Sequence, residues 1–271
     1  MIELPESYTI SAQINKYLVG KFISYIELLK TPHGFCFLRG DKEKYAGYLE
    51  GQEIVSAEYH GGMIQINTLD STILLFDGAY PKYYDDKRKF PKKHQLALYF
   101  EDETALFVSI QMYGGIFVFP KGTCDNSYYR LACQKPSPLT EEFTLEYFKD
   151  LYFELKKKTS AKAFLATEQR IPGLGNGVLQ DILWDAGIDP RCVVTEDNLE
   201  SLYASTKKVL TKMVEDGGRD TERSLFGEKG GYITQLSKKT LYQPCMKCGH
   251  EIHKASYMGG TVYFCDQCQR R

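Results

Sequence analysis

Four cysteines near the C-terminus have the spacing that most clearly predicts chemistry. They form two Cys-x-x-Cys pairs, Cys245 with Cys248 and Cys265 with Cys268, and sixteen residues separate the pairs. This arrangement is typical of a structural zinc site, because each pair brings two thiolates to one tetrahedral metal ion. Two disulfides are the alternative, but we expect a reducing compartment, in which thiols persist. With four protein ligands, the zinc would stabilise the fold and take no part in catalysis.

A glycine-rich turn is the second feature suited to binding a ligand. Gly173 and Gly175 permit a tight turn whose backbone N–H groups approach an anion closely. Asn176 follows them, where it would cap the next helix and offer its amide to a phosphate oxygen. Alone, such a turn is more typical of a plain connection between two helices, so phosphate binding depends on further features.

Two carboxylates, Glu3 and Glu6, stand close to the amino end. Placed beside a nucleophile, they would exchange protons with it. They would also stabilise the positive end of a first helix, which requires no chemistry. The residues alone leave both interpretations open.

The hydrophobic pattern along the chain predicts the elements that position these residues. Residues 5–17 begin with a proline suited to a first helical turn and repeat apolar residues at helical spacing. Residues 20–133 contain many short apolar runs separated by turns, which is typical of a β-sandwich or barrel. After a polar, proline-bearing linker, the pattern predicts four helices, at 142–157, 161–168, 177–186 and 198–215. A mobile loop is predicted after them, at 217–241.

A chain of 271 residues has room for more than one core. We therefore expect a multidomain α+β protein. Its predicted parts are an N-terminal β-sandwich domain with a leading helix at 1–135, a helical domain at 136–241 and a zinc-finger hairpin at 242–271.

The charge and hydropathy of the chain limit the kinds of partner that it can bind. The net charge of −1, taken alone, argues against nucleic acid, but residues 101–200 carry 10 basic and 16 acidic side chains while residues 201–271 carry 12 and 7. The C-terminal part is therefore basic, with a balance of +5. No apolar run of about 18 residues is present, and residues 1–6 lack the features of a signal peptide. We expect an intracellular, cytoplasmic protein, associated with the nucleoid in a bacterium, and no membrane partner.

Taken together, these segments resemble the formamidopyrimidine-DNA glycosylase and endonuclease VIII family. The resemblance lies in the stretch from Lys162 to Pro190, which contains Ile-Pro-Gly-Leu-Gly-Asn and ends in Ala-Gly-Ile-Asp-Pro, and in the closing Cys-x-x-Cys-Gln of the finger. The opening Glu-Leu-Pro-Glu at 3–6 and the succession of domains match as well. The resemblance spans the whole chain and identifies the predicted helical domain as a helix–two-turn–helix domain.

The resemblance also implies a function in base-excision repair. Family members bind damaged double-stranded DNA between the β domain and the helical domain, and they flip a base out of the stack. They break its glycosidic bond through a Schiff base at the N-terminal amine and then cleave the strand. By this resemblance Asn176 and Lys162 contact DNA phosphates, while Met112 and Tyr113 fill the gap left by the flipped base. We expect a monomer.

Several positions depart from the family pattern. The family's nucleophile is a proline directly after the initiator methionine, and here that residue is Ile2, whose bulk should keep Met1 in place. Gly62 stands where the family has a phosphate-binding lysine, and Gly260 stands where it has the arginine of the finger. Ala79, at a position of the family's wedge, is too short to fill a gap in the duplex.

Three hypotheses follow from these departures. In the first, the protein is a DNA glycosylase with altered chemistry, in which Met1 supplies the amine beside Glu3, or Glu3 or Glu6 activates water. In the second, it has lost catalysis and binds damaged or bent duplex DNA. In the third, it is a zinc-stabilised protein-interaction module, against which the retained Asn176 and Lys162 argue. We further expect basic residues of 217–241, Arg219 among them, to contact phosphates.

Overall fold

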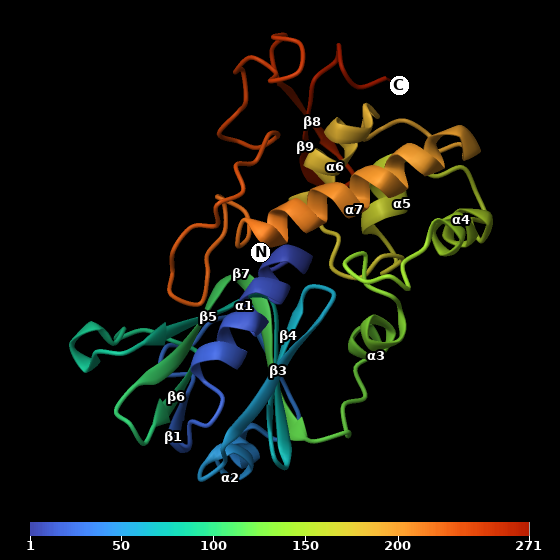
Figure 1. Ribbon diagram of the computed structural model, residues 1–271. Helices are drawn as coiled ribbons and strands as arrows, with labels where there is room; N and C mark the ends of the chain where they lie inside the picture. The colour runs from blue at the N-terminus through green and yellow to red at the C-terminus, as the bar shows by residue number, and fades with distance from the viewer. Residues whose placement is uncertain (271) are drawn as a thin grey trace.

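The computed structural model describes residues 1–270 and consists of a β-sheet half, a helical half and a small hairpin unit on the helical half (Figure 1). The sheet half begins with a helix that lies along the sheet, and the N-terminus lies where the two halves meet (Figure 1). Its elements are α1 (Leu4–Tyr17), β1 (Ile23–Leu28), β2 (Cys36–Arg39), α2 (Tyr45–Leu49), β3 (Ile54–His60), β4 (Met63–Thr68), β5 (Ser71–Tyr84), β6 (Leu96–Phe100) and β7 (Ala105–Pro120).

The sheet is organised around the two long strands β5 and β7. The strand order is β1-β6-β7-β5-β4-β3, and β2 pairs in parallel with β7. The register of the β5–β7 pair shifts between Asp77 and Ala79. On one side of this bulge β5 pairs with β4 and β7 with β2, whereas on the other side β7 pairs with β6. A bulge bends its strand, so one hydrogen-bonded network serves both layers of the predicted sandwich. That sandwich and its leading helix are confirmed.

The helical half contains α3 (Ser127–Gln134), α4 (Leu145–Phe153), α5 (Ala161–Ala166), α6 (Val178–Ala186) and α7 (Leu199–Glu215). Side chains accept a backbone N–H at the start of three of these helices, where Asn126, Thr144 and Ser160 are the caps. A second apolar core fills this half, and it includes Leu4 of α1. The four helices predicted between 142 and 215 are therefore present, with shorter bounds, and α3 was not predicted.

The segment after α7, which we call the strap (residues 216–241), contains no helix or strand. It nevertheless contacts the sheet half closely. Leu225 is fully buried in the sheet-half core. Its N–H donates to Gln13 Oε1 at 2.9 Å, and its C=O accepts the N–H of Tyr83 at 2.8 Å. These contacts oppose the mobility that the sequence predicts for this loop.

The hairpin unit consists of β8 (His253–Tyr257) and β9 (Gly260–Phe264), and it packs against α6. Its small core contains Leu236, Ile252 and two of the four C-terminal cysteines. Within residues 1–270, no helix has both the length and the apolar character that a membrane crossing requires.

Candidate functional site

The four C-terminal cysteines come together as predicted. Their sulfur atoms all lie within 4.8 Å of one another. Cys245 and Cys268 are 3.8 Å apart, and Cys248 and Cys265 are 3.5 Å apart. Zinc–sulfur bonds of about 2.3 Å in a tetrahedron separate the sulfurs by about 3.8 Å, so the cluster fits zinc. No disulfide joins any of the eight cysteines, which removes the alternative considered from the sequence.

Trp184 of α6 contacts the four-cysteine site directly. The indole N–H of Trp184 donates to the Cys245 sulfur at 3.2 Å, and the Lys247 ammonium lies 4.4 Å from the centre of the Trp184 rings. Burial raises the pKa of the Cys245 thiol, but this N–H and the backbone N–H groups of Lys247 and Cys248 outweigh burial and lower that pKa to about 6. A thiolate is the form that binds metal.

The anion at the glycine-rich turn is the carboxylate of Glu3. It accepts the backbone N–H groups of Gly177 at 2.9 Å and Val178 at 2.8 Å, at the N-terminus of α6. Asn176, which the sequence predicts as the cap of this helix, does not cap it. A buried carboxylate satisfies these N–H groups and the positive end of the helix dipole together, so the asparagine side chain is free for other contacts.

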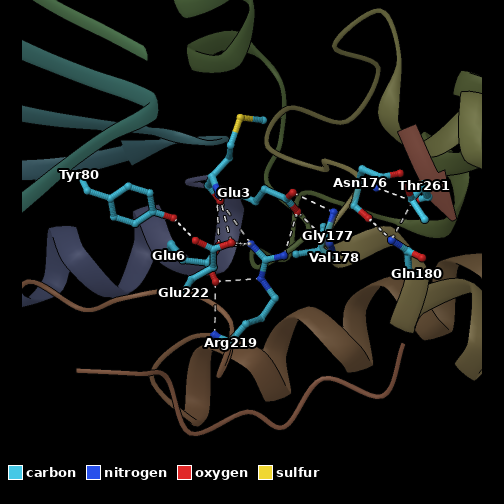
Figure 2. A network of polar contacts seen from close by, with 11 residues as sticks. Glu3, Glu6, Tyr80, Asn176, Gly177, Val178, Gln180, Arg219, Glu222 and Thr261 are labelled. Carbon is cyan, nitrogen blue, oxygen red and sulfur yellow. Dashed lines mark hydrogen bonds and ion pairs between the residues drawn. The ribbon is translucent and has the colours of Figure 1, made fainter. Parts of the chain in front are cut away.

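Arg219 connects the carboxylates of the amino end (Figure 2). Its guanidinium is 2.6 Å from Glu6 Oε2, 3.5 Å from Glu3 Oε2 and 3.9 Å from Glu222 Oε1. The side chain is fully buried, at 2% exposure. Expected phosphate contacts by Arg219 are therefore wrong, because three carboxylates already surround its charge. The amine of Met1 lies 3.1 Å from Glu222 Oε1.

Burial and neighbouring charges have opposite effects on the pKa values of Glu3 and Arg219. Burial raises the pKa of Glu3, and the nearby Arg219 and the two backbone N–H groups of α6 oppose that rise. Burial lowers the pKa of Arg219, but Glu3 and Glu6 outweigh it, and the result is a pKa well above its usual value. The arginine is thus permanently charged, and it balances part of the negative charge around it.

The glycines of the turn are required by these contacts. A Cβ at Gly175 would lie 2.5 Å from Glu3 Oε1, and one at Gly177 would overlap Arg219 Nη1. Gly173 has a φ of +82° and meets the backbone of Gly61 from the β3–β4 turn. The close approach predicted for this turn is thus present, but its partners are groups of the protein itself.

Asn176 and Lys162 both reach the β8–β9 hairpin. Lys162 Nζ donates to Tyr257 O at 2.7 Å. Asn176 Nδ2 donates to Thr261 O at 2.9 Å, as Figure 2 shows. A Cβ at Gly260 would lie 3.3 Å from the lysine ammonium. Gly260 is thus bordered by the ammonium group of Lys162 and the side-chain amide of Asn176.

A cavity of about 420 Å³ opens between the two halves. Met1, Glu3, Gly173, Gly175 and Tyr113 line it, so most of the residues predicted at the amino end and the turn share one site. Further lining residues include Ile2, Gly62, Phe76 and Asp77.

The predicted wedge residues differ from one another. Met112 is 75% exposed and has a φ of +64°, so it projects from the sheet half. Tyr113 lines the cavity and is 37% exposed. Ala79 is fully buried, which agrees with its exclusion as a wedge. Phe76, two residues before the glycine of the β5 bulge, lines the cavity and was overlooked.

Sequence reasoning also overlooked Arg219 as an ion-pair partner, together with Glu222 and Asp77. Arg219 and Glu6 lie 213 residues apart. No local pattern links a loop arginine to a first-turn glutamate at that distance. The single available signal was the excess of carboxylates at the amino end, which requires a buried countercharge.

Comparison with known proteins finds relatives over the full length. The formamidopyrimidine-DNA glycosylase of Streptococcus pneumoniae (strain ATCC BAA-255 / R6) is 29% identical over 282 residues, covering 100% of both chains. That of Listeria monocytogenes serovar 1/2a (strain ATCC BAA-679 / EGD-e) is 25% identical at the same coverage. No family model matches the chain.

Solved structures share the fold. The complex between the Lactococcus lactis Fpg and DNA containing an abasic site has a TM-score of 0.82 at 22% identity, over 99% of this chain and 100% of that chain. The MutM (Fpg) protein from Thermus thermophilus has a TM-score of 0.79 at 22% identity, over 98% of both chains. The fold and the four-cysteine site thus define a two-lobed protein with a zinc finger. Over its full length the chain is similar to formamidopyrimidine-DNA glycosylases in sequence and to Fpg structures in fold.

Proposed function

We propose that the protein binds duplex DNA at a damaged or abasic nucleotide and that the Met1 α-amine attacks C1′ of that nucleotide. The position of this amine carries the proposal. Met1 lines the cavity between the two halves, is 37% exposed and has its amine beside Glu222. An amine in an accessible cavity beside a carboxylate has the arrangement that Schiff-base formation requires.

The nitrogen of residue 2 cannot serve as this nucleophile while Met1 is present. It is a peptide N–H, and it donates to Asp77 O at 2.7 Å. Its lone pair is delocalised over the amide, so the available amine lies one residue earlier, at Met1. The reaction therefore rests on retention of the methionine.

Two polar groups beside the hairpin support DNA binding. Lys162 is 5% exposed, and no ion pair reaches it from any residue between 1 and 270. The Oδ1 atom of Asn176 is buried without a hydrogen-bond partner in the same part of the chain. A buried ammonium without a carboxylate favours an anion, and a DNA phosphate is the anion that relatives named as DNA glycosylases would meet.

A second function, DNA binding without catalysis, is favoured by the contacts of Glu3. Its carboxylate accepts two backbone N–H groups and faces Arg219, so proton transfer would disturb the packing of α6. A protein that needed Glu3 only for structure would retain the same contacts.

Trapping with borohydride distinguishes the two functions. The protein is incubated with duplex DNA that carries an abasic site, and intact mass spectrometry first verifies that Met1 is the N-terminal residue. We expect a covalent adduct that is lost when two residues are added before Met1. Tight binding without any adduct would contradict the catalytic proposal and leave the DNA-binding protein.

DNA binding itself is tested with the double variant Lys162→Ala, Asn176→Ala. We expect weaker binding of the duplex and a salt dependence whose slope falls by about 1, because one phosphate contact is lost. Lys89→Ala, at an exposed lysine between β5 and β6 of the sheet half, is the control. Unchanged affinity in the double variant would remove these residues from the interface.

A further inference from the structure

Asp77 occupies a strained position at the bulge of β5. Its φ is +58°, a left-handed conformation that costs about 1 kcal/mol for a residue other than glycine. The next residue, Gly78, is held tightly, since a Cβ there would overlap Gln111 O. Strain of this kind persists where the surrounding structure enforces it, and it is concentrated at functional sites.

The bulge brings Asp77 against the amino end. Asp77 O accepts the N–H of Ile2 at 2.7 Å, and Asp77 and Met1 line the same cavity. No hydrogen bond or ion pair reaches the Asp77 carboxylate from residues 1–270. Burial raises the pKa of this carboxyl, and the N-terminal ammonium opposes that rise. Asp77 thus lines the same cavity as Met1, and its carboxylate has no side-chain partner among residues 1–270.

The other carboxylates near the amine are committed to structural contacts. Glu3 accepts two N–H groups at the start of α6. Glu6 is paired with Arg219 at 2.6 Å. Glu222 accepts the hydroxyl of Tyr80 besides its ion pair with Met1. A proton placed on any of these three would remove an acceptor from a buried network, at a cost of about 1–3 kcal/mol.

We infer that Asp77 is the proton-transfer partner of the Met1 amine. The assignment rests on the proposed function, and it moves the acid–base group, like the nucleophile, away from the positions expected from the family. Proton transfer by Asp77 leaves the Glu3–Arg219–Glu6 network intact throughout the reaction.

The covalent step balances with Asp77 as the only side chain that changes protonation. Its carboxylate takes one proton from the Met1 ammonium, and the amine lone pair then forms a bond to C1′ of the ring-opened abasic sugar. The aldehyde oxygen receives the proton from Asp77 and a second one from the attacking nitrogen, and it leaves as water. The product is a protonated imine between the Met1 nitrogen and C1′, and its positive charge equals that of the original ammonium.

The variant Asp77→Asn tests this assignment, because asparagine keeps the shape and tolerates the left-handed conformation. The rate of adduct trapping with cyanoborohydride is measured from pH 6 to pH 9, and binding is measured with a tetrahydrofuran analogue of the abasic site that cannot react. The titratable and charged groups around the amine are Glu222 on the strap, which is paired with it, Arg219 beside Glu222, and Asp77 on β5 and Tyr113 on β7, which line the same cavity. Asp70→Asn, just before β5, is the matched control.

We expect Asp77→Asn to trap about 100-fold more slowly than the wild type at pH 7 while it binds the analogue equally well. The difference should shrink as the pH rises, because solvent then deprotonates the amine without help. Equal trapping rates for Asp77→Asn and the wild type at every pH would overturn the role of Asp77 and leave the proposed function intact. No adduct with the wild-type protein would overturn both.

Discussion

At the scale of single residues, glycine determines how closely the two halves approach. Gly173 from the turn before α6 meets Gly61 and Gly62 from the turn between β3 and β4, with 2.5 Å between a built Cβ and Gly61 C. The atoms on both sides belong to backbone, which cannot move aside as a flexible side chain can. The contact therefore fixes the distance across the cavity that holds Met1.

We expect Gly173→Ala to lower the free energy of unfolding by about 2–4 kcal/mol, from overpacking and from the unfavourable φ together. Gly217→Ala is the matched control, because Gly217 has a similar φ of +72° but open space around its Cα. Its loss should be about 1 kcal/mol. Urea unfolding measures both variants, and equal losses would mean that the contact with Gly61 contributes nothing beyond backbone strain.

At the scale of elements, α6 gathers contacts from every part of the chain. Glu3 of the amino end binds its first N–H groups, Trp184 near its end binds a zinc ligand, and Asp181 between them binds the strap. The Asp181 carboxylate accepts the N–H groups of Gln235 at 2.9 Å and Leu236 at 2.8 Å. The helix thus connects the cavity to the zinc site.

Asp181 should make stability depend on pH in an unusual direction. Burial raises its pKa from 3.8 to about 6, although the two N–H donors oppose the rise. The folded protein therefore holds a proton between pH 4 and pH 6 that the unfolded chain has released, so stability falls as the pH rises through this range. Relative to Asp181→Asn, we expect the wild type to lose about 2.4 kcal/mol between pH 4 and pH 7.

Urea unfolding of both proteins across this range measures the difference. Other titrating groups, including the zinc ligands, affect both proteins alike, so the comparison isolates Asp181. Parallel stability curves would show that the pKa of Asp181 does not change on folding.

Helices and metal ligands could be predicted where the pattern that indicates them lies within a short stretch of sequence. The helices at 161–168 and 177–186 appear within a few residues of their predicted ends, and the four cysteines carry their own spacing. The strap was misjudged because its Gly- and Lys-rich sequence resembles a free loop, while its partners Gln13 and Tyr83 are distant from it in the sequence. Charge neutralisation by Arg219 has the same non-local origin.

At the scale of the whole molecule, the cores of the two halves and of the hairpin unit are connected by a few specific side chains. Leu4 of the first helix lies in the core of the helical half, and Leu225 of the strap lies in the core of the sheet half. Tyr59 of the sheet half also packs against the helical core, and Phe226 of the strap packs against the sheet-half core, so these contacts tie the parts together. The hairpin unit depends on α6 and on its four cysteines, since its own apolar core is small.

Removal of zinc should consequently unfold the hairpin unit and leave both halves folded. Binding of the metal supplies most of the folding free energy of such a small unit. Trp184 is the only tryptophan of the chain, and it donates to Cys245 and is covered by Lys247. We expect a chelator to shift its fluorescence to longer wavelength, while the far-ultraviolet circular dichroism changes little.

The same treatment should weaken DNA binding, because Lys162 and Asn176 are positioned by the carbonyl groups of Tyr257 and Thr261 on the hairpin. Cys248→Ser, which removes one ligand, should show the shifted fluorescence without any chelator. Restoration of zinc should reverse the shift in the wild type but not in this variant. A metal-free protein with unshifted fluorescence and undiminished DNA binding would contradict both the zinc assignment and the dependence of the phosphate-binding residues on the hairpin.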